Sequence, residues 1–372
     1  MIRILFVTGQ FNVAGTETFI MNVLRTSNRN RFTYDILTFK ERSNKYVEEA
    51  RSLGCSIITL ASRNSSPIRY FTQLNSFFKE NAHSYNVVHW CGGNISSIAP
   101  IYFAWKYKIP IRIVHAHSSS SMGLHTKILH LINRCFVPFL CNYLFSCSSL
   151  ASSYFFRYNN AIIIKNGIDV NRYKYDDDVR TLLRLKLGYS NKDIVLGHVG
   201  RFDKNKNQTF LVDILSELLK TNNNFKLLLV GDGETFDVVK EKIQSLGLNN
   251  HVLMLGNRRD VNVLYQAMDC FVMPSYYEGL PFVLVEAQAA SLPCVISETI
   301  NDDAKIIPLV IKKNLNGGVK QWSDAIHDII LKPRKDLSKY VIKKGFSIVD
   351  TVKYLESVYS QNNNYESNEC VV

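Results

Sequence analysis

Short runs of β-branched and aliphatic residues alternate with amphipathic helical stretches along almost the whole chain. Parallel strands need a crossover to return to the same sheet edge, so this alternation predicts parallel sheets with helical connections. The expected strands are too many for one twisted sheet, which favours an α/β fold of two doubly wound domains. They are Ile2–Thr8, Tyr34–Thr38, Ser56–Leu60, Val87–His89, Ile111–His115, Tyr143–Cys147, Ala161–Lys165, Ile194–Val199, Lys226–Val230, His251–Leu255, Cys270–Met273 and Pro293–Ile296.

A polar stretch near Asn171–Asn191 separates the two groups of strands. It follows an Asn166-Gly167 turn and contains an acidic start, a basic helix and a terminating glycine, which is the charge order that suits a helix dipole. We therefore predict a first domain over residues 1–175 and a second over residues 190–344. A closed barrel of eight repeats is the alternative, and it fits a mid-chain linker poorly.

Positive charge is concentrated in the first half of the chain. The formal net charge is +12, yet residues 1–175 hold 20 Lys and Arg against 7 Asp and Glu. No acidic residue occurs between Glu80 and Asp169, whereas seven basic residues do. This asymmetry predicts an anionic partner for the first domain. A basic surface that is merely solvated is the alternative, and no nucleic-acid-binding module is recognisable.

Membrane-spanning and metal-binding segments are not predicted. The most apolar long stretch, Ile128–Phe145, contains His130, Asn133 and Arg134, whereas a spanning helix needs roughly 20 apolar residues with few interruptions. The initial apolar run is too short for a secretory leader. None of the eight cysteines forms a CxxC pair, which favours reduced thiols over a zinc site. We expect a cytoplasmic protein without a metal.

The segment from Pro274 to Ala290 reads PSYYEGLPFVLVEAQAA. Pro281 is suited to the first position of a helix, and the helix that follows is apolar nearly all round, which predicts burial. Glu286 is its only formal charge. A buried carboxylate without partners costs free energy, so we expect a ligand hydroxyl to bind it; a structural arginine or a backbone group is the alternative.

Glu278 and Glu286, in their PSxxEGLP context, resemble the E-x7-E motif of glycosyltransferase family 4. Gly200-Arg201 with Lys206 is similar to the G-R-x4-K pair of that family, and Gly231-Asp232-Gly233 is similar to its VGDG turn. The resemblance implies the GT-B fold, in which two Rossmann-like domains face each other across a cleft that holds the active site. It also implies a closing helix, about residues 345–361, that completes the first domain before a disordered tail over residues 362–372.

Catalytic roles follow from the resemblance. Arg201 and Lys206 are expected to stabilise a departing nucleoside diphosphate without a metal ion, with Lys204 as the alternative to Lys206. Glu278 is expected to orient the transferred sugar. His117, at the end of a central strand, is the first choice for a histidine beside that sugar. His115 is the second choice, and because the two alternate by two they share a strand face; a packed core histidine is the other reading.

Donor-binding roles also follow from the resemblance. Glu286 is expected to accept hydrogen bonds from the ribose hydroxyls. The amides around the start of its helix, at Gly279, Leu280 and Phe282, suit a diphosphate. Two further candidates are Arg258, in a loop that family members wrap around the base, and Gly15, in the family's glycine-rich first turn.

The function that the resemblance implies is retaining transfer of a sugar from a nucleotide diphosphate, most often UDP, to a saccharide acceptor. A basic first domain suits a polyisoprenyl-diphosphate-linked acceptor at the inner membrane face, as in bacterial capsule, exopolysaccharide or O-antigen assembly. The alternatives are a GDP-sugar with a soluble acceptor, an epimerase or phosphorylase, and a catalytically silent nucleotide-sugar-binding subunit. A nicotinamide oxidoreductase fits poorly because no GxGxxG follows the first strand.

Two further stretches of sequence bear on the substrate and on membrane contact. Ser291 replaces a glycine that is common after the E-x7-E helix, and the next loop lacks the family's glycine-rich segment, so the sugar is not predicted. The stretch from Met122 to Phe145 carries Lys127 and Arg134 within apolar sequence. We expect it to dock on anionic lipid, with a buried core helix as the alternative.

Overall fold

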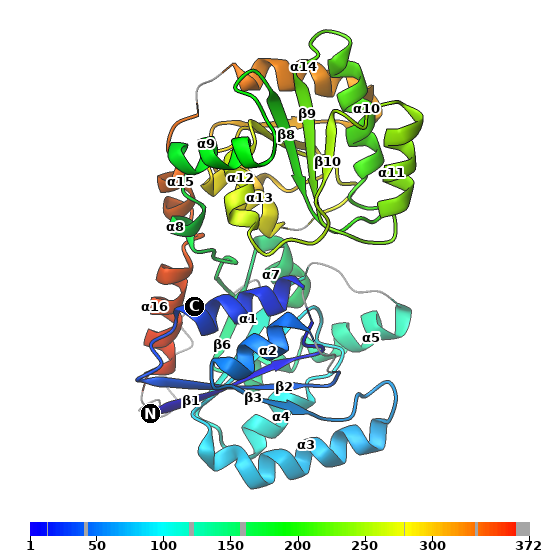
Figure 1. The fold of residues 1–372 in the computed structure, drawn as a ribbon. Helices are drawn as coiled ribbons and strands as arrows, with labels where there is room; N and C mark the ends of the chain where they lie inside the picture. The colour runs from blue at the N-terminus through cyan, green and yellow to red at the C-terminus, as the bar shows by residue number, and fades with distance from the viewer. Residues whose placement is uncertain are drawn as a thin grey trace. The chain divides into compact units, whose positions relative to one another are not determined.

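The computed structural model describes residues 1–12, 14–40, 44–118, 123–156, 161–278, 280–331 and 334–361. Contacts divide the chain into two compact units (Figure 1). Unit 1 comprises Met1–Gly167 with the C-terminal segment from Ile348, and unit 2 comprises Ile168–Ser347. The division precedes the predicted limit at residue 175, because helix α8 (Val170–Tyr173) packs against α12, α13 and α15 of unit 2. The tail predicted for residues 362–372 is outside the described residues.

Unit 1 is built on a seven-stranded sheet with the order β3-β2-β1-β4-β5-β6-β7, and every strand pair is parallel. The strands are β1 (Ile2–Thr8), β2 (Phe32–Thr38), β3 (Ser56–Thr59), β4 (Val87–Gly92), β5 (Ile111–Ala116), β6 (Tyr143–Ser146) and β7 (Ile162–Ile163). The helices are α1 (Gly15–Thr26), α2 (Lys45–Ser52), α3 (Pro67–Asn81), α4 (Ala99–Lys106), α5 (Leu124–Asn133), α6 (Val137–Leu140), α7 (Ser149–Phe155) and α16 (Ile348–Tyr359).

Unit 2 is built on a six-stranded parallel sheet with the order β10-β9-β8-β11-β12-β13. The strands are β8 (Ile194–Val199), β9 (Phe225–Val230), β10 (Val252–Met254), β11 (Cys270–Met273), β12 (Cys294–Ser297) and β13 (Val310–Lys313). Besides α8, the helices are α9 (Asp177–Lys186), α10 (Gln208–Leu219), α11 (Phe236–Ser245), α12 (Val261–Ala267), α13 (Phe282–Ala289), α14 (Gly318–Ile330) and α15 (Ser338–Lys343). The strand β13 was missed by the sequence analysis.

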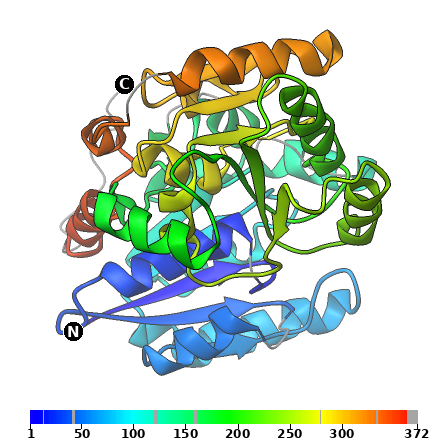
Figure 2. The same cartoon turned by 45° about the horizontal axis from the view of Figure 1, so that its top comes forward.

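Two parallel, doubly wound sheets confirm the predicted fold class. In unit 2, helices α10, α11 and α14 pack on one face of the sheet, and α12, α13 and α15 pack on the other (Figure 2). The inner strands of both units are buried on both faces, which explains their continuous apolar runs. Strand order reverses between β1 and β4 in unit 1 and between β8 and β11 in unit 2. Ligands of open α/β sheets bind beyond the carboxyl ends of the strands at such points.

Helix α16 returns to unit 1 after the chain has completed unit 2. It lies beside α1 (Figure 1). Glu356 accepts a hydrogen bond from the Ser27 hydroxyl at 2.7 Å, and the Tyr359 hydroxyl lies 2.6 Å from Nδ1 of His89. The last helix therefore contributes buried polar partners to the core of unit 1.

Helices α5 and α6 do not form the buried core helix that was the alternative prediction for the stretch from Met122 to Phe145. His130 is the buried residue of α5, while Leu124, Ile128 and Leu131 on the same helix are exposed. Met122 is outside the described residues. Within the described part of the chain, no helix is long and apolar enough to cross a membrane.

Candidate active site

Glycines at the carboxyl edge of the unit 2 sheet bring two turns into contact. The turn after β9 contains Gly231 and Gly233, which have φ values of +133° and +156°. A Cβ on Gly231 would lie 1.9 Å from the carbonyl oxygen of Gly200, in the turn after β8, and one on Gly233 would lie 2.3 Å from that of Phe202. Glycine is therefore required here by the packing of the protein itself, whatever ligand binds beside it.

Lys206 and Glu278, two of the predicted catalytic residues, form an ion pair. Lys206 Nζ lies 2.5 Å from Glu278 Oε1, and the two side chains are 16% and 13% exposed. The Lys206 backbone amide donates to the Asp203 carboxylate at 3.0 Å. The turn after β8 thus presents its cation to the segment that follows β11. A ligand phosphate at this place would compete with the Glu278 carboxylate for the ammonium group.

Asn205 joins the same two segments through three hydrogen bonds, and the sequence analysis missed it. Its side-chain amide donates to the Tyr277 carbonyl at 2.8 Å, and its side-chain oxygen accepts from the Tyr277 amide at 3.0 Å. Its backbone carbonyl accepts from the Tyr276 amide at 2.8 Å. These bonds fix the backbone on both sides of the Lys206–Glu278 pair. Within a polar loop sequence, nothing distinguishes this asparagine from its neighbours.

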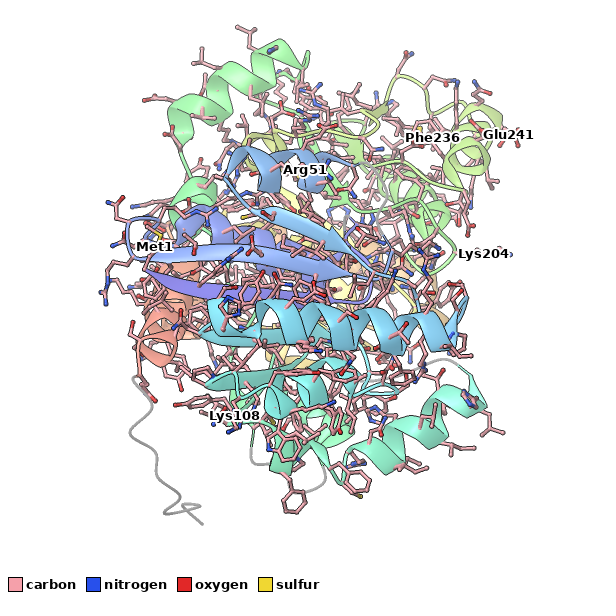
Figure 3. All side chains as sticks on the ribbon, turned by 90° about the horizontal axis from the view of Figure 1, so that it is seen from below. Met1, Arg51, Lys108, Lys204, Phe236 and Glu241 are labelled. Atoms are coloured by element: carbon pink, nitrogen blue, oxygen red, sulfur yellow. The ribbon has the colours of Figure 1, made fainter. Side chains whose placement is uncertain are left out.

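Arg201 is placed differently from Lys206. Its side chain is 78% exposed, and its Nε donates to Asp203 at 2.9 Å. Its backbone carbonyl is fixed by the buried side chain of Gln208 at 2.8 Å. Lys204, the alternative cation, is also exposed (Figure 3). The structure thus holds Lys206 in a defined position with little exposure, whereas Arg201 is exposed and paired within its own turn, and Lys204 is exposed.

A buried histidine supports the start of this turn. Nδ1 of His198 donates to the Val272 carbonyl at 2.9 Å, and its Nε2 lies 3.5 Å from the Gln208 amide nitrogen. Burial lowers the pKa of His198 to about 4, so the ring is neutral at physiological pH, with its proton on Nδ1. The sequence analysis missed His198 because it lies inside a strand and reads as core.

Glu286 lies on α13 between two tyrosine hydroxyls. Tyr173 donates to its Oε1 and Tyr265 to its Oε2, each at 3.0 Å. Burial raises the pKa of Glu286, and the two tyrosine hydrogen bonds oppose that rise. The protein partners of Glu286 are therefore tyrosines and not the arginine or backbone group of the alternative prediction. Since a carboxylate oxygen has two lone pairs, each oxygen keeps one acceptor position for a further donor.

The start of α13 differs by one position from the prediction. Pro281 is the N-cap residue and the helix begins at Phe282, so the proline precedes the helix instead of opening it. Leu280 and Phe282 are partly buried and pack against the core of unit 2. Gly279 is outside the described residues. The backbone amides at the start of α13 remain the groups that suit an anion.

Arg258 is bound within its own loop. Its Nε and Nη2 donate to the two carboxylate oxygens of Asp260 at 2.8 and 2.7 Å. Both side chains are exposed. A side chain held in this way is less available to a ligand than the sequence analysis expected.

His117 and His115 occupy different environments in unit 1. His115 is fully buried, with its Nδ1 3.2 Å from Nε2 of His89, so it is a core histidine. His117 follows β5, and among the described residues neither of its ring nitrogens has a hydrogen-bond partner of standard geometry. Burial lowers the pKa of His117 to about 3, which neighbouring Asn166 opposes. His117 is thus a neutral ring with unused donor and acceptor capacity.

Gly15 is the first residue of α1, and its position is open. A Cβ added there would meet no atom within 4 Å, so the protein's own packing does not require a glycine. The space beside this helix start is compatible with the close backbone approach that the sequence analysis expected. Nearby Glu17 is buried and accepts a hydrogen bond from the Thr8 hydroxyl at 3.0 Å.

In the described ranges of the chain, one cluster of residues has side chains of the kinds that bind metal ions. Potential ligand atoms of His89, Cys91 and His115 lie within 4.8 Å of one another. Both ring nitrogens of His89 are already in hydrogen bonds. Burial raises the pKa of the Cys91 thiol well above its usual value, which disfavours the thiolate that a metal requires. This group is better explained as a buried polar cluster of the core.

Comparison with known proteins finds similarity to glycosyltransferases, in the second unit and along the whole chain. Residues 179–345 match the family described as "Glycosyl transferases group 1". EpsF of Bacillus subtilis (strain 168), which is named as a glycosyltransferase, is 29% identical over 375 residues, 96% of each protein. The Staphylococcus aureus protein named "Capsular polysaccharide biosynthesis glycosyltransferase CapH" is 23% identical over 367 residues, 96% of this chain and 99% of that one.

Two further similarities concern a named reaction and the fold. An Escherichia coli protein named "UDP-Gal:alpha-D-GlcNAc-diphosphoundecaprenol alpha-1,3-galactosyltransferase" is 28% identical over 210 residues, 53% of each protein. The crystal structure of HepE from Anabaena in complex with UDP-glucose superposes with a TM-score of 0.74 at 18% identity, covering 97% of this chain and 100% of that one. At this identity, the structural likeness supports the two-sheet fold.

Proposed function

We infer that this glycosyltransferase, whose residues 179–345 match the group 1 family, binds a nucleotide sugar in unit 2 and retains the configuration of the transferred sugar. UDP is the nucleotide we propose, because the E. coli relative is named for a UDP-sugar and HepE was crystallised with UDP-glucose. A GDP-sugar is the second candidate. The observation that carries the proposal is the Lys206–Glu278 pair together with Glu286, which lies on the helix that follows Glu278 and is held by tyrosine hydroxyls.

Two parts of the donor, the ribose and the diphosphate, have complementary groups in unit 2. The two unused acceptor positions on Glu286 match the two hydroxyls of a ribose. The Lys206 ammonium, already within hydrogen-bond reach of a carboxylate, can turn to the diphosphate as negative charge grows on it. Arg201 can add a second cation by exchanging its Asp203 partner for the diphosphate. Fixed cations of this kind stabilise a leaving phosphate most when the bond breaks, so the proposed mechanism uses no metal.

The proposed step exchanges one bond at the anomeric carbon. The bond from that carbon to the diphosphate oxygen breaks, and the acceptor hydroxyl bonds to the same face of the sugar. The hydroxyl proton passes to the departing phosphate oxygen, so atoms and charge balance without a separate base. In unit 2, Glu278 is the proposed group that orients sugar hydroxyls. In unit 1, the neutral ring of His117 keeps one donor and one acceptor at physiological pH, because its pKa is lowered.

For the acceptor, we propose a saccharide on a polyisoprenyl diphosphate, in the assembly of a surface polysaccharide. The E. coli relative is named for such an acceptor, and CapH is named for capsule biosynthesis. The excess of basic residues in the first half of the chain suits an anionic carrier at a membrane. A soluble acceptor is the alternative. A catalytically silent subunit is disfavoured because the Lys206–Glu278 pair, Glu286 and Arg201 are all present.

A panel of nucleotide sugars tests the proposed donor. In a thermal-shift assay, a UDP-sugar is expected to stabilise the full chain most, since binding to the folded state raises the melting temperature. The best donor is then incubated with a GlcNAc-diphosphate-lipid, and the product is analysed for the anomeric configuration of the new bond. An inverted product would exclude the retaining mechanism, and stabilisation by GDP-sugars alone would exclude the UDP assignment.

Helices α5 and α6 provide the structural basis for proposing membrane contact. Six apolar side chains there are about half exposed or more: Leu124, Ile128, Leu131, Ile132, Phe136 and Phe139. Leu124 and Phe139 are 76% and 81% exposed. The surrounding sequence carries Lys127 and, between Glu80 and Asp169, no acidic residue. Apolar and cationic groups on one short segment favour insertion at the surface of an anionic bilayer.

Liposome flotation tests this membrane contact. The wild-type protein is expected to float with vesicles that contain anionic lipid, and less at high salt because screening weakens the attraction. Leu124→Ser/Phe139→Ser should remove the apolar part, and Lys127→Glu the electrostatic part. Ile68→Ser is the matched control, since Ile68 is 82% exposed on α3 of the same unit. If the wild type stays unbound at low salt, a soluble acceptor becomes the better proposal.

A further inference from the structure

A cavity of about 470 Å³ opens in unit 1 at the carboxyl edge of the sheet. Its walls come from the turns after β1, β2, β3 and β4 and from helices α3 and α4. This is the place where strand order reverses between β1 and β4, which is where open α/β sheets bind ligands. Its lining includes Gln10, Lys40, Arg63, Tyr70, Trp90 and Ser97. None of the residues assigned to the donor belongs to it.

The charge of the cavity is positive. Lys40 and Arg63 are the lining residues with a formal charge. Among the described residues, neither has an acidic partner in an ion pair. Around Arg63, Glu80 is the single acidic residue between Glu49 and Asp169; Glu41, which follows Lys40, is outside the described residues. A concave site lined by cations attracts anions.

Arg63 is oriented by neutral groups. One terminal nitrogen donates to the Ser96 carbonyl and the other lies 3.2 Å from the Ser96 hydroxyl. Its positive charge also opposes the rise that burial gives to the pKa of Tyr70, which lines the same cavity. Since a guanidinium has five N–H donors, several stay available to a ligand in a fixed direction. Such a fork matches phosphate and carboxylate oxygens.

Polar and apolar groups complete the site. The Tyr70 and Ser97 hydroxyls are 2.9 Å apart at its wall. Trp90 and Phe39 provide aromatic surface, which suits the C–H faces of a sugar or an isoprenoid chain. The cavity therefore offers an anion fork, hydroxyls and aromatic rings together.

We propose that this cavity is an acceptor subsite that binds an anionic group of the acceptor, with Arg63 as its main ligand and Lys40 as a second cation. The group is either the diphosphate of a lipid carrier or the carboxylate of an acidic sugar, because both have the oxygens that Arg63 recognises. The proposal rests on the proposed glycosyltransfer and adds a requirement to it: a neutral acceptor should bind poorly.

Calorimetry on the full chain tests the subsite with three amphiphiles that share a decyl chain. They are decyl-diphospho-GlcNAc, decyl glucuronide and neutral decyl glucoside, each titrated with saturating UDP so that anions do not enter the donor site. At least one anionic amphiphile is expected to bind about tenfold more tightly than the neutral one. Arg63→Ala should remove this preference, a loss of about tenfold in the affinity for the anionic amphiphile, as expected for a charged hydrogen-bonded contact.

Controls separate this subsite from the donor site and from folding. Arg69→Ala, which removes an exposed arginine on α3 outside the cavity, should bind like the wild type. Lys40→Ala removes an exposed side chain and should cost a few-fold, with no risk to folding. UDP affinity should be unchanged in all variants, because the proposed donor site lies in unit 2, and an unchanged melting temperature shows that unit 1 of each variant is folded. Equal binding of all three amphiphiles by the wild type, or a preserved preference in Arg63→Ala, would overturn the subsite while leaving the proposed donor chemistry intact.

Discussion

Lys206→Ala is expected to lower kcat by roughly 10²–10³-fold, as the removal of a single preorganised transition-state donor does in other enzymes. The reason is that the Lys206 ammonium is fixed on the turn after β8 and its side chain is only 16% exposed. Water in its place would therefore stabilise the charge on the diphosphate much less than the ammonium does. UDP affinity should fall much less than kcat, because charge on the diphosphate is largest when the sugar leaves. Steady-state kinetics with calorimetry of UDP binding measures both quantities.

Three controls isolate the cation from its surroundings. Lys204→Ala, two positions away and exposed, should retain near wild-type turnover, which distinguishes Lys206 from its sequence neighbour. Lys206→Arg keeps the charge and should recover part of the rate. Removing Lys206 also leaves the Glu278 carboxylate without its partner, and breaking a buried pair is destabilising, so the melting temperature must be measured too. Full wild-type activity is expected in EDTA; an absolute need for a divalent ion in the chemical step would refute the metal-free mechanism.

Strand periodicity predicted most of the architecture because buried parallel strands are continuous apolar runs. The strand Val310–Lys313 escaped this test, since half of its four residues are lysines. Likewise, the apolar stretch of α5 could be read as a core helix or as a surface helix. The amino-acid composition of the segment is the same whether it forms a core helix or a surface helix. Only the packing of neighbouring elements decides which of its side chains remain exposed.

The residues of the candidate site likewise divide into those that the sequence reveals and those that only the fold reveals. Glu278, Glu286 and Lys206 stand out because charged residues occur at fixed places in an apolar or glycine-rich context. Their partners do not, because they come from distant parts of the chain: Tyr173 is 113 residues from Glu286, and Asn205 is 72 residues from Tyr277. A tyrosine or an asparagine in a loop has many structural uses, so its role became visible only when the fold brought it to the carboxylate or to the second turn.

Glu286→Ala is expected to weaken UDP binding by roughly ten- to a hundredfold, since hydrogen bonds to a charged group are worth about 1.5–3 kcal/mol. The lost contacts are those of the ribose hydroxyls to the two free acceptor positions of the carboxylate. Calorimetry gives the affinity, and Glu241→Ala, an exposed glutamate on α11 (Figure 3), is the matched control. Unchanged UDP affinity in a folded Glu286→Ala variant would refute the assignment of Glu286 to the ribose.

The pH dependence of nucleoside binding gives an independent readout of the same carboxylate. Burial raises the pKa of Glu286 above its usual value, and the ionised form is the better acceptor, so affinity should fall as the pH is lowered through that raised pKa. Uridine is the appropriate probe, because the phosphate of a nucleotide would itself titrate at about pH 6. Tyr173→Phe removes a hydrogen bond that lowers the pKa of Glu286. The fall in affinity should therefore begin at a higher pH in this variant, and it should disappear in Glu286→Gln. A tyrosine that only packed against α13 would leave the pH profile where it is in the wild type, because packing alone does not change the proton affinity of the carboxylate.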